Sequence, residues 1–115
     1  MCFVFSVEAK VIVKYGHVAP PIHPQHHGAL AFAKYVTEKT SGAIEVQVFP
    51  IGQFGGERSL TEQVQGGTLQ MTSVTAGVLA NFVPEMGIIE LPFVYPDRDT
   101  AYKVLDDKDV KEPFL

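Results

Sequence analysis

The chain has 115 residues, of which 46% are hydrophobic and 19% charged, and its formal net charge is −4. This composition is typical of one folded domain and excludes a disordered chain. Lysine and arginine are scattered singly, so nucleic acid is excluded as an expected partner. No apolar run reaches the roughly 18 residues of a membrane helix, and we do not expect the protein itself to be membrane-embedded.

The first nine residues differ from the rest of the chain. Residues 2–5 are largely apolar, and Val7 and Ala9 supply small residues at the −3 and −1 positions of a possible cleavage before Lys10. We interpret residues 1–9 as a possible signal-peptide remnant. A short edge strand is the alternative interpretation.

From residue 10 onward, strand-like and helix-like patterns alternate. Residues 10–15 are rich in β-branched and aromatic residues and stop at Gly16, which predicts a strand. After Pro24, apolar residues recur with helical spacing as far as Val36, and Gly42 predicts the end of that helix.

The same alternation continues to the end of the chain. The further expected strands are residues 44–48, 69–73 and 88–91. The further expected helices begin near Glu57, Ala76, and Asp97 or Asp99. Strands separated by helices need crossover connections, which are normally parallel and right-handed. We therefore expect an α/β fold with an open, mostly parallel sheet and helices on both faces.

In such sheets, ligands bind at the loops beyond the carboxyl ends of the strands. The expected loops are residues 17–23, 51–57, 74–77 and 91–97. All four should therefore meet along one edge of the sheet. The apolar ending Phe114-Leu115 indicates a chain that stops within a longer protein.

Several segments, taken in order, resemble the DctP-type solute-binding proteins of TRAP transporters. The most specific is the sequence FPIGQFGGER at residues 49–58, and it is accompanied by similar segments at residues 13–21, 32–46, 64–71 and 90–95. The resemblance implies a periplasmic protein of two lobes, with a type II periplasmic-binding-protein-like fold, which captures a small organic acid and delivers it to a TRAP membrane permease. On this basis, residues 10–115 are the N-terminal lobe, and the second lobe is missing.

The resemblance also implies that no catalysis and no cofactor are expected. In this family, an arginine of the second lobe clamps the ligand carboxylate, and no residue of this chain matches it. The chain alone is therefore not expected to complete a tight site.

Six residues are candidates for ligand binding, and each has a plainer alternative. Glu57 could accept a hydrogen bond from a ligand hydroxyl, or it could simply begin a helix in solvent. Arg58 could pair with a carboxylate or brace its own lobe. By resemblance Thr75 faces the ligand, although its hydroxyl could instead cap a helix. Ser73 is a weaker candidate of the same kind.

The remaining candidates follow the first strand and the expected fourth strand. His17 could donate a hydrogen bond to an acid, and Val18 could offer shape and its backbone. Phe93 could line the cleft, but it could equally belong to the core.

Two other functions remain open at this point. His23 and His27 are four residues apart and could share a helical face, as in a metal enzyme. A structural zinc site needs four ligands, however, and no metal is expected. Alternatively, the chain is a small domain that associates through an exposed sheet edge.

Overall fold

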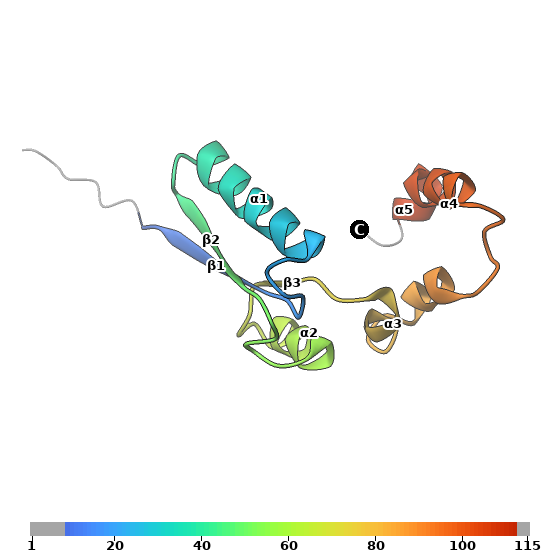
Figure 1. The fold of residues 1–115 in the computed structure, drawn as a ribbon, viewed down its shortest axis with the longest axis horizontal. Helices are drawn as coiled ribbons and strands as arrows, with labels where there is room; N and C mark the ends of the chain where they lie inside the picture. The colour runs from blue at the N-terminus through green and yellow to red at the C-terminus, as the bar shows by residue number, and fades with distance from the viewer. Residues whose placement is uncertain (1–8, 113–115) are drawn as a thin grey trace, which may run out of the picture.

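The computed structural model describes residues 9–112 (Figure 1). The interpretation of residues 1–9 as a signal remnant therefore falls almost entirely outside the described residues. The same is true of the argument from Phe114 and Leu115.

A small parallel sheet organises the fold. Its strands are β1 (Val11–Gly16), β2 (Ile44–Phe49) and β3 (Met71–Thr72), in the spatial order β2-β1-β3. Both neighbours run parallel to β1. The three strands confirm the sequence-based expectation, and β1 lies in the centre, so the connection from β2 to β3 crosses over it.

Two helices cover opposite faces of this sheet, α1 (Pro24–Lys39) on one side and α2 (Glu57–Gln65) on the other (Figure 1). Successive residues of a strand point to opposite faces. Tyr15 accordingly packs with Ala29 of α1 in the core. Its neighbour Gly16 faces the fully buried Leu60 of α2. The expected α/β fold with helices on both faces is therefore confirmed.

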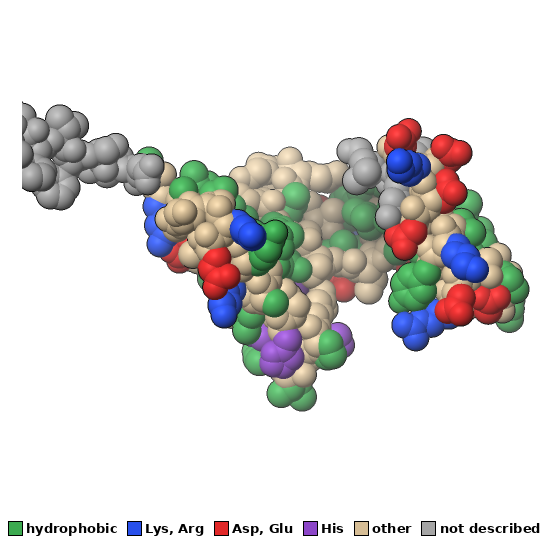
Figure 2. Space-filling model, turned by 90° about the horizontal axis from the view of Figure 1, so that it is seen from above, with side chains coloured by type: hydrophobic (Ala, Val, Ile, Leu, Met, Phe, Trp, Pro, Cys, Tyr) green, Lys and Arg blue, Asp and Glu red, His purple; other side chains and the backbone are tan. Residues whose placement is uncertain are grey.

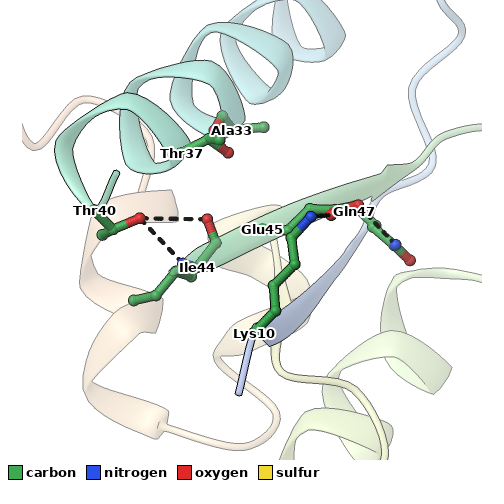
Figure 3. A network of polar contacts seen from close by, with 7 residues as sticks. All are labelled: Lys10, Ala33, Thr37, Thr40, Ile44, Glu45 and Gln47. Carbon is green, nitrogen blue, oxygen red and sulfur yellow. Dashed lines mark hydrogen bonds and ion pairs between the residues drawn. The ribbon is translucent and has the colours of Figure 1, made fainter. Parts of the chain in front are cut away.

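The connection from α1 to β2 is fixed by local hydrogen bonds (Figure 3). Thr40 Oγ1 donates to the carbonyl oxygen of Val36 at 2.8 Å and accepts from the backbone N–H of Ile44 at 3.1 Å. The N–H of Gly42 donates to Thr37 O at 2.9 Å and the N–H of Ser41 to Glu38 O at 3.3 Å, which are the two hydrogen bonds of a Schellman motif. The left-handed residue of that motif is Ser41, with φ 51°, so Gly42 lies one position later than the usual capping glycine.

The predicted fourth strand at residues 88–91 is wrong. These residues lie at the end of a 3₁₀ helix, η1 (Pro84–Glu90), which follows the short helix α3 (Ala76–Leu79). Proline at the first position favours a helical turn. The segment also packs beside α3 rather than on the sheet, because Gly87 and Glu90 approach Ala80 and Gly77. Ile88 consequently remains 54% exposed.

The last elements are α4 (Arg98–Asp106) and α5 (Lys108–Lys111), which stand apart from the sheet (Figure 1). Of the two residues expected near the start of this helix, Asp97 and Asp99, it is Asp97 that caps it, since its Oδ1 accepts from the N–H of Thr100 at 2.7 Å. Among the described residues, no helix has both the length and the apolar character needed to cross a membrane.

Candidate functional site

The loops that follow β1, β2 and β3 lie at one edge of the sheet, because all three strands run in the same direction. The first two loops are tied together through their backbones. Gly52 N donates to His17 O at 3.0 Å, and Ile51 N donates to Ala19 O at 3.2 Å. We call the residues at these strand ends, 17–19, 55–57 and 73–75, the rim.

The rim brings together two of the predicted site residues, Glu57 and Thr75. Oε2 of Glu57 accepts hydrogen bonds from Thr75 Oγ1 at 2.7 Å and from Thr75 N at 3.1 Å. Glu57 occupies the first turn of α2, where the helix dipole favours a carboxylate. Thr75 precedes α3, but its hydroxyl makes no capping bond there. The pair therefore presents carboxylate and hydroxyl oxygens at an exposed position.

His17 also belongs to the rim, yet its side chain lies beneath the surface. The residue is 0% exposed, and its Nε2 lies 3.1 Å from Nδ1 of His26. Burial lowers the pKa of His17, and the neighbouring His26 and His23 lower it further. Its Nδ1 is buried without a partner. The neutral tautomer protonated on Nε2 leaves only a lone pair unsatisfied there, which costs less than burying an orphan N–H.

Histidine side chains gather on the protrusion at the lower middle of Figure 2. Three of the histidines, His23, His26 and His27, lie at the start of α1. His23 caps that helix, because its Nδ1 accepts from Gln25 N at 3.2 Å. Within residues 9–112, no group of three histidine, cysteine or acidic side chains is arranged to hold a metal ion. His23 and His26 instead hold the start of α1, through the cap on Gln25 N and the contact with His17.

The other predicted site residues are placed differently. Val18 is half-buried beside the loop that contains Gly52. Arg58 points along its own helix, where its Nε donates to Glu62 Oε1 at 3.1 Å, and its side chain is 78% exposed. Phe93 is 99% exposed on the segment that leads to α4. The expectation that residues 91–97 join the rim is wrong, because residues 88–91 form no strand.

The pattern of the sequence did not single out two contacts at the rim or directly next to it. Gln25 Nε2 donates to Ser73 Oγ at 2.6 Å, and Thr72 Oγ1 donates to Gly16 O at 2.9 Å. The sequence makes Ser73 a weak candidate, but a glutamine in the first turn of a helix is typically solvated. No local signal in the sequence marks Gln25, because its partner lies 48 residues away.

A groove of about 400 Å³ adjoins the rim between α2, β3 and α3. Its walls are mostly apolar and include Val64, Leu79 and Phe82, with Thr72 and Ser73 at the border with the rim. Among the residues that the structure describes, no cationic side chain lines it. The groove therefore offers a carboxylate no charge partner, and the polar groups of the site gather on the rim itself.

Residues 15–114 match the model of the bacterial extracellular solute-binding protein family 7, DctP, and the chain belongs to this family. It is 45% identical over 78 residues to the uncharacterized protein YiiZ of Salmonella typhimurium, covering 68% of this chain and 24% of that protein.

Crystal structures of TRAP periplasmic solute-binding proteins are similar as well. The Polaromonas protein bound to D-erythronate has a TM-score of 0.84 and 35% identity, over 92% of this chain and 35% of its own. The Desulfovibrio salexigens protein with bound orotic acid has a TM-score of 0.83 and 36% identity, over 90% and 34%. The chain thus spans about a quarter to a third of the length of these relatives.

Proposed function

We propose that this chain is the first lobe of a periplasmic solute-binding protein, which captures a small organic acid and delivers it to a TRAP membrane permease. Family membership supports the role in solute binding. The acids bound by the similar Polaromonas and Desulfovibrio proteins, D-erythronate and orotic acid, support the ligand class. The permease partner and the periplasmic location follow from the role of a TRAP binding protein.

The observation that carries the proposal is the Glu57–Thr75 pair at the carboxyl edge of a parallel sheet. Binding sites in open α/β folds lie at this edge. Such sites use a few polar groups to fix the orientation of the ligand. The description of the family as solute-binding proteins supports binding rather than catalysis.

The chemistry of the pair indicates how an acid would lie. A carboxylate at position 57 repels a ligand carboxylate, but it accepts hydrogen bonds from ligand hydroxyl groups. The rim would therefore bind the end of a hydroxy acid that carries the hydroxyl groups. The ligand carboxylate would point away from Glu57, toward a cationic group outside this lobe.

Thermal unfolding of the complete product of the gene tests this proposal. The probes are succinate, 2-oxoglutarate, D-erythronate and D-glucuronate, each at a large excess. A ligand present at 100 times its Kd adds about 2.7 kcal/mol of stability, so binding gives a clear rise in Tm. We expect a rise with at least one acid.

The variant Glu57→Gln tests whether Glu57 contacts the hydroxyl groups of the ligand, separately from whether the protein binds an acid at all. It should weaken the binding of a hydroxy acid more than that of an acid without hydroxyl groups, because the stronger charge-assisted acceptor is lost. Glu38→Gln is the matched control, since Glu38 is also a helical glutamate but pairs with Lys34 on α1, outside the rim. No rise in Tm with any of the four acids would contradict the proposed function.

A further inference from the structure

We propose that Gln25 is a positioning residue for the rim, which holds the segment 73–75 in place from the first turn of α1. This inference rests on the proposed function for its effect on binding. Its structural part concerns how Ser73 and Thr75 are held, and can be tested without a ligand.

The segment 73–75 needs such support because the sheet does not reach it. Strand β3 has only two residues, and its ladder with β1 pairs Tyr15 with Met71 and Gly16 with Thr72. The side chain of Thr72 adds one more bond to Gly16 O at 2.9 Å. Beyond Thr72, the chain leaves the sheet and reaches α3, which is a single turn of four residues.

Two side chains hold this segment from opposite sides. Glu57 of α2 holds Thr75 through an exposed carboxylate. Gln25 of α1 holds Ser73 through a partly buried bond of 2.6 Å. Since water competes less for partly buried groups, loss of the Gln25 amide would leave the Ser73 hydroxyl poorly satisfied.

Gln25 is well placed to act as an anchor because its own position is fixed twice. Its backbone N–H donates to the capping ring of His23 at 3.2 Å. The next residue, His26, pairs with the buried His17 at the end of β1. The start of α1 is therefore held against the end of β1. Because Gln25 lies in this first turn, its hydrogen bond holds the loop after β3 at a fixed distance from β1.

Amide hydrogen exchange, measured on the complete gene product, tests the structural part. In Gln25→Ala, we expect the N–H of Thr75 to exchange about two- to tenfold faster, which is the scale of one hydrogen bond. Ser73→Ala should have a similar effect. The double variant should be no worse than either single variant, because both remove the same contact.

Gln47→Ala is the matched control. Gln47 also donates through Nε2, to Glu45 Oε1 at 2.9 Å, but it lies on β2 and outside the rim. It should leave Thr75 exchange unchanged. Unchanged exchange in Gln25→Ala, or additive effects of Gln25→Ala and Ser73→Ala, would overturn the inference.

The Kd for an organic acid that binds the wild-type protein provides the second readout. Gln25→Ala should raise this Kd by about two- to tenfold, and Gln47→Ala should not change it. Altered exchange with an unaltered Kd would overturn the positioning role. If the wild-type protein binds no acid, the proposed function fails, while the exchange experiment still decides whether Gln25 holds the segment.

Discussion

Glu57 and Thr75 are 18 residues apart in the chain, yet one carboxylate oxygen of Glu57 accepts from both the hydroxyl and the backbone N–H of Thr75. These bonds join the first turn of α2 to the loop that follows β3. A carboxylate that accepts two hydrogen bonds from one residue fixes both the loop and its own orientation. The rim is thus defined by a contact between two elements that meet only in the folded protein.

The variant Thr75→Val should affect ligand binding more than stability. It removes the hydroxyl donor to Glu57, but the bond is exposed, so we expect a loss of at most about 1 kcal/mol in the free energy of unfolding. The Kd for a hydroxy acid should rise, since the hydroxyl belongs to the rim. Urea unfolding and calorimetric titration measure the two effects.

Thr68→Val provides the control for Thr75→Val. The Thr68 hydroxyl donates to Gln63 O at 3.2 Å and is also exposed, but it lies after α2 and outside the rim. A similarly small loss of stability with no change in Kd is expected. An equal change in Kd for both variants would contradict a specific role of Thr75.

Two glycine-to-alanine variants should have opposite effects on stability. A Cβ at Gly16 would lie 3.0 Å from Leu60 Cδ2 and 3.3 Å from Leu69 Cδ2, so Gly16→Ala should lower the free energy of unfolding by about 1–3 kcal/mol. A Cβ at Gly28, within α1, meets nothing within 4 Å. Gly28→Ala should therefore raise stability by about 0.5–1 kcal/mol. Urea unfolding curves that shift in the same direction would contradict this packing.

The end of α1 offers a stabilising substitution. Ser41 adopts φ 51°, a left-handed conformation that costs a residue with a side chain about 1–2 kcal/mol relative to glycine. Ser41→Gly should therefore raise the melting temperature. Gly42 has φ 82°, and a Cβ there would meet nothing within 4 Å, so Gly42→Ala should lower the melting temperature through backbone strain alone. A lower melting temperature for Ser41→Gly and a higher one for Gly42→Ala would contradict this cap.

Stability should fall as the pH is lowered through about 6.5, because of His17. Its pKa in the folded protein lies below the ordinary value of 6.5, so in this range the unfolded chain binds more protons than the folded one. The stabilising effect of the neutral ring is complete above about pH 6.5 and is lost as the pH falls toward the lower folded pKa. Urea unfolding at several pH values between about 7 and 5 measures the slope.

His17→Phe should flatten this slope, since it keeps a ring in the buried site but removes the titrating group. Thr61→Val is the control, because it changes another buried polar residue that does not titrate in this range and should leave the slope unchanged. Glu45 and Asp97 also have lowered pKa values, but from ordinary values of 4.5 and 3.8, so their contributions are lost only at lower pH. An unaltered slope in His17→Phe would assign the pH dependence to other groups.

Much of the first half of the fold could be predicted because its signals are local. The alternation of Ile44, Val46 and Val48 with polar residues predicted β2, and the spacing of apolar residues after Pro24 predicted α1. Arg58 and Glu62 also carry a local signal, which predicts that they pair with each other. They are four residues apart on α2, the spacing of a helical salt bridge.

The residues of the sequence by themselves determined the three strands and the two helices that cover them, because the periodicity of each segment is local information. They also determined the edge of the sheet where the loops gather, because strands joined through helices run parallel. Tertiary structure alone decided that residues 88–91 form no strand, that the His17 ring is buried and that Gln25 reaches Ser73. Each of these depends on contacts between distant segments. Hydrogen bonds and burial at such contacts depend on distances in space, which a pattern along the chain does not specify.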